Sequence, residues 1–580
     1  MSLISDTIAF IVGCAASFGM TDAVTKELRI RPKDYGVRVE RSVKFATNDG
    51  TNLSAEIFHP VGPAKTPTIL VRAPISQSPD TCFLVEVVGR VWAERGYTAV
   101  IQGTRGRFGS GGDFYPMKFE RQDGIETLRW LRQQPWFNGQ VLGWGGSAFG
   151  QTEWSISDQT NPKFNAMEIY FASSKFHDMF YQGNAFALYS AVGWTLRSHG
   201  KKADESAWLS TNRILRAASG FPMSDSDRRD LGVHVTFFQD WIKHKDVDNY
   251  WREIDGDNRA ATTESPALFV AGWYDPFLKT ELSDFQQVCL SKNMNARRSR
   301  LVIGPWSHAR DVQLPDFKNN QKFRPLSIAL SIPWFDAAIR DQEQGPEVQL
   351  FTIGSNRWRK EKEWPLARTK YTNFYLSSDK PANSAVGGGV LSTEPATRLR
   401  CDRIEYDPLH PVPTAGGAMI GDAAGMCLQK TCEERQDVLV YTSQPLTEDL
   451  EITGPVKAVL NVSTDVRCTD FTAKVVDVYP DGRAYNLCDG IIRRSYEPAQ
   501  STDEGAVEEI EIDLTATSNV FRKRHRIRLD VSSSNFPRFD RNPNTGRDPA
   551  TETHPVTAHQ RIYSGNRFNS RLILPVIPNN

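Results

Sequence analysis

Apolar runs that alternate with amphipathic segments in the first third of the chain limit its fold more than any other feature. The runs TPTILVRAP at 66–74 and YTAVIQG at 97–103 are typical of buried strands. Between them, FLVEVVGRVWAERG at 83–96 has the apolar spacing of a helix that ends at Gly96. Strands joined through a helix pair in parallel, because the crossover returns the chain to the same end of the sheet. The sequence therefore predicts an α/β sheet.

Composition narrows the class of protein. The chain has 580 residues, of which 39% are hydrophobic, so two or three domains with their own cores are expected. Lys and Arg together number 69 and so do Asp and Glu, and a net charge of zero argues against a nucleic-acid partner. The eight cysteines include no pair at zinc-ligand spacing, so we expect no metal site and no cofactor.

The pattern changes twice further along the chain. Residues 156–260 contain helical stretches such as NAFALYSAVGWTL and predict a helical insertion into the sheet. Strand runs return with PALFVAGWYD at 266–275. Beyond Trp364, short alternating strands such as AVLNVST and TAKVVDVYP are typical of an all-β sandwich or jelly roll.

The N-terminal run Thr7–Gly19 is the most apolar part of the first 38 residues. It has the length of a signal-peptide core, but no Lys or Arg precedes Lys26, and it is too short to span a membrane. We therefore expect a packed N-terminal helix and a cytoplasmic protein without a membrane span, with secretion as the alternative.

Ser147 lies in GWGGSAFG, directly after a predicted strand and before a predicted helix. A serine on such a sharp turn projects its hydroxyl above the edge of the sheet, which is typical of a nucleophile. The usual spacing is G-x-S-x-G. Gly145 fits this spacing, but Phe149 stands where the second glycine is expected and the glycine follows at 150.

Two later strands end in the residue types that would complete a catalytic triad. ALFVAGWYD ends at Asp275 and LVIGPWSH ends at His308, so the order is Ser, Asp, His, as in α/β-hydrolases. Parallel strands bring these ends to one edge. In this hypothesis His308 takes the proton of Ser147 and Asp275 orients the imidazole. The backbone N–H of Ala148 is the first expected oxyanion donor.

The chain resembles the family of cocaine esterase and X-Pro dipeptidyl-peptidase (CocE/NonD, peptidase S15-like), whose members are serine hydrolases. The segments on which this resemblance rests are RGRFGSGGDF, WLRQQPWFNGQVLGWGGSAFG, AGWYDPF, IGPWSH, FTIGSNRWRKEKEWP, YDPLHPVPTAGG and SSNFPRFDRNPNTG. The resemblance implies an α/β-hydrolase sheet with an inserted helical cap, followed by an all-β jelly-roll domain. The boundaries expected are residues 1–155 and 261–365 for the α/β-hydrolase domain, with 1–38 as an N-terminal helical extension, 156–260 for the cap and 366–580 for the jelly roll.

Two departures from the family pattern concern the oxyanion hole and the pocket. Family members usually carry Arg-x-Pro-Tyr, whose tyrosine supplies a second oxyanion donor, but here the last residue is Ile75. Ser76 is a substitute donor if the loop shifts. The nucleophile is usually followed by Tyr, and here Ala148 stands there. Both changes make the substrate pocket more apolar, and Tyr181 and Phe277 are pocket walls in this hypothesis, although either could equally belong to a core.

The function expected is hydrolysis of an ester, thioester or amide of an apolar acyl substrate through an acyl-enzyme on Ser147. An acyltransferase or cyclase of polyketide or peptide metabolism is the alternative, and a third hypothesis is a non-covalent binding protein on the same scaffold. The partner expected is a small apolar molecule, and a homodimer is left open. The loops of Asp275 and His308 are rich in aromatic residues, which we expect around the reaction centre: Trp273, Tyr274, Phe277 and Trp306.

Overall fold

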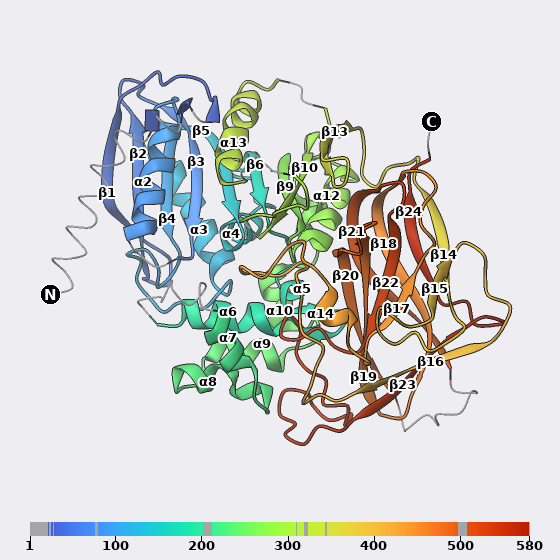
Figure 1. Ribbon diagram of the computed structural model, residues 1–580. Helices are drawn as coiled ribbons and strands as arrows, with labels where there is room; N and C mark the ends of the chain where they lie inside the picture. Colours follow the sequence, from blue (N-terminus) through green and yellow to red (C-terminus); the bar gives the residue numbers. More distant parts are fainter. Residues whose placement is uncertain are drawn as a thin grey trace.

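The computed structural model describes residues 21–578 except 23–24, 27, 76–78, 201–210, 309, 318–322, 343–344 and 497–506. The helix expected at Thr7–Gly19 and the substitute donor Ser76 therefore lie outside the described residues. Figure 1 shows three parts: a sheet with flanking helices in blue to yellow-green, a group of green helices, and a β-domain in orange and red. None of the helices in the described part of the chain combines the length and the apolarity that a membrane crossing needs.

The first sheet has the α/β architecture that the sequence predicts. Its strands lie in the order β1 (Val37–Ala46), β2 (Asn52–Pro60), β4 (Thr98–Gly103), β3 (Thr66–Ala73), β5 (Phe137–Gly146), β6 (Phe164–Tyr170), β9 (Ala267–Tyr274), β10 (Arg300–Ser307), β12 (Glu347–Thr352) and β13 (Arg357–Glu361), with β11 (Arg310–Asp311) beside β10. Pairing is parallel from β4 to β12 and antiparallel at both edges. The ends of β5, β9 and β10 therefore lie at one edge.

Helices cover both faces of this sheet. On one face, α2 (Pro79–Ala93) and α13 (Phe323–Ile339) share an apolar cluster and are joined by a hydrogen bond from Trp92 Nε1 to Ser331 Oγ (3.1 Å). On the other face lie α3 (Glu120–Arg132) and α12 (Leu278–Cys289), whose buried leucines pack into a second cluster.

The strand β6 differs from the expectation of a helical insertion over 156–260. It is a central strand, paired in parallel with β5 and β9. Its sequence, FNAMEIY, has polar residues at Asn165 and Glu168, which hide the apolar run of a buried strand. Glu168 is nevertheless fully buried, and burial raises its pKa well above the ordinary range, so a neutral carboxyl fits the site. The helical insertion follows this strand and does not precede it.

The inserted helices pack around an aromatic core. They are α5 (His177–Phe180), α6 (Leu188–Ser198), α7 (Thr211–Ala218), α8 (Ser226–Leu231), α9 (Thr236–Lys243), α10 (Asn249–Asp255) and α11 (Arg259–Thr262), with the hairpin β7 (Tyr181–Gln182) and β8 (Ala185–Phe186). Phe180 stacks on Trp241 with ring centroids 4.2 Å apart, and Trp194 stacks on Trp241 at 5.5 Å. These helices form the cap.

Two buried carboxylates hold the segment that leads into the cap. Asp284 of α12 accepts hydrogen bonds from Ser173 Oγ (2.9 Å) and from the backbone N–H and hydroxyl of Ser174 (both 2.7 Å). Asp255 accepts from the N–H groups of Phe176 (2.7 Å) and His177 (3.1 Å). Burial raises the pKa of each carboxyl to about 6.

Among its described residues, the C-terminal part has one helix, α14 (Lys430–Glu433), and is otherwise built from strands. Its strands lie in the order β16 (Arg400–Tyr406), β23 (Ala558–Ser564), β18 (Leu450–Thr464), β24 (Arg571–Val576), β14 (Lys370–Ser378), β15 (Gly389–Ser392), β17 (Leu439–Thr442), β22 (Arg526–Ser532), β19 (Cys468–Val478) and β20 (Ala484–Ser495), with β21 (Glu508–Phe521) beside β18. This confirms the predicted fold class: an α/β-hydrolase sheet with an inserted cap, followed by a jelly-roll β-domain.

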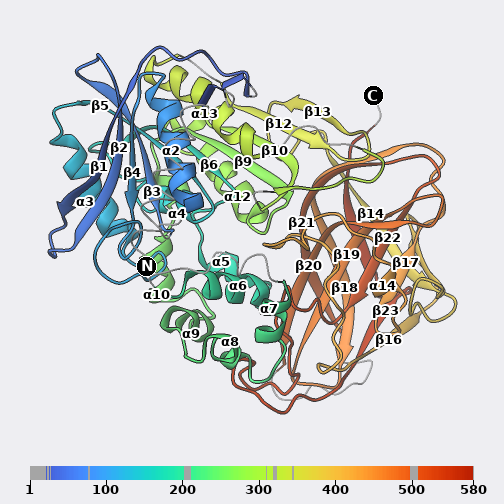
Figure 2. The ribbon, with the colours of Figure 1, turned by 60° about the vertical axis from the view of Figure 1, so that its left-hand side comes forward.

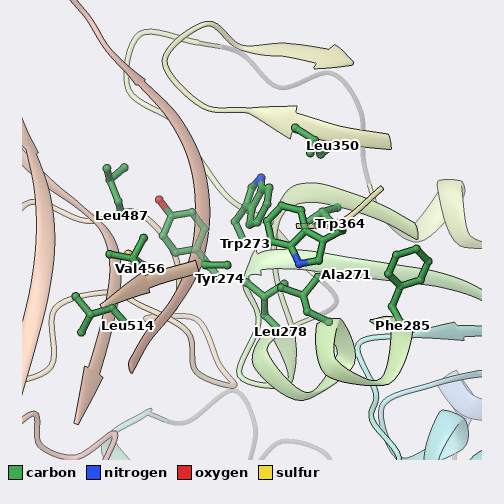
Figure 3. Close-up of a cluster of buried hydrophobic side chains, with 14 of the residues drawn as sticks. Ala271, Trp273, Tyr274, Leu278, Phe285, Leu350, Trp364, Val456, Leu487 and Leu514 are labelled. Atoms are coloured by element: carbon green, nitrogen blue, oxygen red, sulfur yellow. The ribbon is translucent and has the colours of Figure 1, made fainter. Parts of the chain in front are cut away.

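The sheet and the β-domain share one hydrophobic core. Figure 2 shows the β-domain beside the strands β9, β10 and β12 of the first sheet. At this junction Trp273 packs near Trp364 (ring centroids 6.0 Å apart), and Tyr274 points the other way, toward Val456 and Leu514 of the β-domain (Figure 3). The cluster that contains these residues extends into both sheets.

Candidate active site

Ser147 occupies a strained turn between β5 and α4 (Ala148–Trp154). Its φ of 53° and ψ of −129° are unusual for a residue with a side chain. The turn is held by a hydrogen bond from Ser147 N to the carbonyl of Tyr170 (3.0 Å). A Cβ at Gly146 would lie 1.8 Å from the ring of Tyr170, and one at Gly150 would lie 2.7 Å from Cβ of Ala172. Close packing therefore requires glycine at 150, one place later than in the usual pattern.

The structure brings together the three residues that the sequence order singles out. His308 Nε2 lies 2.8 Å from Ser147 Oγ, and His308 Nδ1 lies 2.7 Å from Asp275 Oδ2. The other carboxylate oxygen of Asp275 accepts the N–H of Phe277 (2.8 Å). Asp275 is 1% exposed, so both oxygens have their partners inside the protein. The arrangement can hold an Nδ1–H imidazole whose Nε2 faces the serine hydroxyl.

Of the two positions where we expected oxyanion donors, residue 148 begins a helix and residue 75 is apolar. Ala148 is the first residue of α4, and the N–H groups of the first turn of a helix have no carbonyl partner within it. Ile75 follows β3 at the same edge, since Leu70 of β3 pairs with Gly143 of β5. The half-buried side chain of Ile75 packs against the apolar cluster beneath α2 and α13.

A buried arginine joins the strand that leads to Ile75 with the helix that follows Ser147. Arg72 is fully buried and donates through Nη1 to the carbonyl of Thr152 and to Ser155 Oγ (both 3.3 Å). Thr152 returns a hydrogen bond from its hydroxyl to the carbonyl of Arg72 (3.1 Å). Burial lowers the pKa of Arg72, and the nearby carboxyls of Glu120 and Glu153 oppose this effect.

Of the four aromatic residues expected around the reaction centre, the structure places one against the histidine. The ring of Phe277 lies 5.6 Å from that of His308 and is 1% exposed. Trp273 and Tyr274 pack away from it, near Trp364 and in the β-domain, and Trp306 packs against Phe171 with ring centroids 6.5 Å apart. Phe171, 5.9 Å from the ring of His308, is a neighbour that the sequence reasoning missed because it follows the missed strand β6.

Tyr181 lies in the cap and not against the serine. Its hydroxyl donates to the carbonyls of Trp241 (3.0 Å) and Ile242 (3.3 Å), and its ring stacks on His177 at 5.2 Å. Tyr181 lines two cavities between the cap and the β-domain, of about 460 and 370 Å³, and the smaller one also reaches Asp275. The residue is thus both a core contact and a cavity wall. In the described part of the chain, no group of three or more His, Cys, Asp or Glu side chains is arranged to hold a metal ion.

Comparison with known proteins decides the family. Residues 49–310 match the model of the X-Pro dipeptidyl-peptidase (S15) family, and residues 339–573 match that of the X-Pro dipeptidyl-peptidase C-terminal non-catalytic domain. The cocaine esterase of Rhodococcus sp. (strain MB1 Bresler) is 35% identical over 94% of this chain and 99% of its own. The chain belongs to this family. It is accordingly a serine hydrolase, with the catalytic and β-domains of the family in their expected order.

Solved structures agree with the fold. An aminopeptidase from a marine sediment archaeon of the Thaumarchaeota superimposes with a TM-score of 0.77 at 23% identity, over 95% of this chain and 98% of the other. An α-amino acid ester hydrolase gives a TM-score of 0.73 at 23% identity, over 94% and 97%. A CocE/NonD family hydrolase from Staphylococcus aureus gives 0.66 at 15% identity, over 94% and 97%.

Proposed function

We propose that the chain hydrolyses esters or related acyl compounds through a covalent acyl-enzyme on Ser147, with His308 as the general base and acid and Asp275 as its partner. The observation that carries the proposal is the unbroken series of contacts from Ser147 Oγ to His308 Nε2 (2.8 Å) and from His308 Nδ1 to Asp275 Oδ2 (2.7 Å). A free serine hydroxyl is a weak nucleophile at neutral pH, and an adjacent base is what activates it.

In the first half-reaction, Oγ of Ser147 attacks the substrate carbonyl while its proton moves to Nε2 of His308. The imidazolium that forms is stabilised by the buried carboxylate of Asp275. That carboxylate is held in place by the N–H of Phe277. His308 then gives the proton to the leaving group, so the acyl group remains on Ser147 as an ester.

In the second half-reaction, water attacks the acyl carbonyl while His308 removes a proton from it. The bond to Ser147 Oγ then breaks, His308 returns the proton to the serine, and the product acid is released. In both halves the carbonyl oxygen of the substrate gains negative charge, and the N–H of Ala148 can donate a hydrogen bond to it. Ile75 can donate nothing from its side chain. One donor of an oxyanion hole is worth about 10²- to 10³-fold in kcat, so the enzyme is expected to be slower than relatives that carry tyrosine there.

The acyl group favoured is uncharged and apolar. The rings of Phe277 and Phe171 lie 5.6 and 5.9 Å from that of His308, and Ile75 and Ala148 stand where the family usually carries tyrosine. The cocaine esterase relative, by its name, also acts on an ester.

The test is labelling with a fluorophosphonate probe together with turnover of p-nitrophenyl esters of increasing chain length. Wild type should label and hydrolyse, and Ser147→Ala should do neither. Ser157→Ala, which alters a buried serine shortly after the same helix whose hydroxyl donates to the carbonyl of Trp154 (3.1 Å), is the matched control and should label like wild type. Equal labelling of wild type and Ser147→Ala would reject Ser147 as the nucleophile.

Transfer of the acyl group to an alcohol, amine or carbon nucleophile is the alternative, since it needs the same acyl-enzyme. The apolar side chains of Ile75, Phe171 and Phe277 are the observation that favours it, because an apolar site keeps water away from the acyl-enzyme. Reaction in water enriched with ¹⁸O separates the two. Label in the product acid indicates hydrolysis, and an unlabelled ester, amide or ring indicates transfer.

A further inference from the structure

The side chain of the residue before Asp275 reaches from the catalytic sheet into the β-domain. Tyr274 ends β9, and its ring lies among side chains of the β-domain, including Val456, Leu487 and Leu514 (Figure 3). Its hydroxyl donates to the carbonyl of Asn486 in β20 (3.2 Å). Tyr274 is 1% exposed, and burial raises its pKa well above the ordinary range, so the hydroxyl stays protonated and remains a donor.

Asn486 also supports the segment that follows His308. Its side chain accepts the N–H of Cys427 (2.7 Å) and donates to the carbonyl of Gly425 (3.1 Å). Gly425 faces Val312, four residues beyond His308: a Cβ at Gly425 would lie 3.1 Å from both methyl carbons of Val312. Val312 is buried in the same core as Tyr274. One residue of the β-domain is thus linked to the loops of both catalytic partners.

We propose that Tyr274 is a positioning residue, anchored on Asn486, through which the β-domain fixes Asp275 against His308. The proposal rests on the function proposed above. The backbone of Asp275 is also held, because its N–H donates to the carbonyl of Gly272 (3.0 Å) and its carbonyl accepts the N–H of Leu278 (3.1 Å). The backbone of Tyr274 pairs with Ser307 of β10, and its side chain ties this end of β9 to the β-domain.

The test compares Tyr274→Phe with Tyr441→Phe in the full-length protein. Tyr441 is the matched control: it is also a fully buried tyrosine of the same core, and its hydroxyl donates to Asp402 Oδ2 (2.9 Å) in the β-domain. Both changes remove one buried hydroxyl and keep the ring. The readouts are the rate constant of fluorophosphonate labelling, kcat and KM for an ester, and the melting temperature.

For Tyr274→Phe we expect the labelling rate and kcat to fall about two- to tenfold, as loss of one hydrogen bond gives, with KM unchanged. Tyr441→Phe should lower the melting temperature and leave the rate as in wild type.

Two results are distinguishable failures. If wild type does not label, the proposed function fails, and the inference fails with it. If wild type labels and Tyr274→Phe matches either wild type or Tyr441→Phe in rate, the inference alone is overturned, and Tyr274 serves only the stability of the junction.

Discussion

Exchange of Asp275 for asparagine is the most informative single change, because the structure fixes how an amide would sit there. In wild type one carboxylate oxygen accepts the N–H of Phe277 (2.8 Å) and the other accepts from His308 Nδ1 (2.7 Å). An asparagine has only one oxygen. If it keeps the bond to Phe277, its NH₂ group faces Nδ1 and selects the tautomer with the proton on Nε2.

That tautomer places an N–H group 2.8 Å from Ser147 Oγ, where a proton acceptor is needed. The opposite rotamer restores the bond to His308 but sets two donors, the amide and the N–H of Phe277, against each other in a buried site, which costs about 1–3 kcal/mol. The same exchange in Ser-His-Asp hydrolases lowers kcat about 10⁴-fold, which corresponds to about 5 kcal/mol of transition-state stabilisation. We expect a loss of this size.

The assay is kcat/KM for p-nitrophenyl butyrate with the melting temperature measured in parallel. Asp284→Asn is the control, since Asp284 is an equally buried aspartate nine residues away whose bonds go to Ser173 and Ser174. Its kcat/KM should stay within about tenfold of wild type, which corresponds to a change of less than about 1.4 kcal/mol in activation free energy. A folded Asp275→Asn enzyme that is as active as this control would refute the reasoning.

Three further changes test other parts of the site. Ile75→Tyr should raise kcat for esters, by up to about 10²-fold, because it returns a second oxyanion donor. Gly150→Ala should destabilise the protein by about 1–3 kcal/mol in urea unfolding, since its Cβ would lie 2.7 Å from that of Ala172. Asp284→Asn should flatten the dependence of stability on pH. In the folded wild type the pKa of Asp284 is raised to about 6, so the unfolded chain loses this proton first as pH rises. The free energy of unfolding of wild type should therefore fall by up to about 3 kcal/mol between pH 4 and pH 7.

Each of these has a clear contrary result. An unchanged kcat in Ile75→Tyr would mean that another group already donates to the oxyanion. Gly345→Ala, at a position with no atom within 4 Å of a new Cβ, is the control for Gly150→Ala, and equal stability of the two would remove the packing argument. An Asp284→Asn protein with the same pH slope as wild type would place the titrating group elsewhere.

The fold was largely predictable because its signals are local. A buried apolar run, a helix and a second run within 66–103 are enough to predict parallel pairing. The missed strand β6 shows where this reasoning stops. Asn165 and Glu168 make the run look polar, yet the neighbouring strands bury Glu168, and burial raises its pKa well above the ordinary range.

The site was predictable in part. The ends of three parallel strands must meet at one edge, so the order Ser147, Asp275, His308 was sufficient to expect them together. In the structure the two nitrogens of His308 lie 2.8 Å from Ser147 Oγ and 2.7 Å from Asp275 Oδ2. The surroundings were not predictable, because a strand end does not say which way each ring turns. Tyr274 and Phe277 are three residues apart, yet one enters the β-domain and the other packs on His308.

The core shared by the catalytic sheet and the β-domain limits how this enzyme can be re-engineered. The core of the cap also takes in Phe277 beside His308 and Met419, Ile420 and Ala550 of the β-domain, so a cap from a relative would have to match these contacts. A β-domain taken from a relative would bring foreign side chains to the places of Val456 and Leu514, against Tyr274. Chimeras of this family should therefore keep their fold best when the cap, the β-domain and the end of β9 are transferred together.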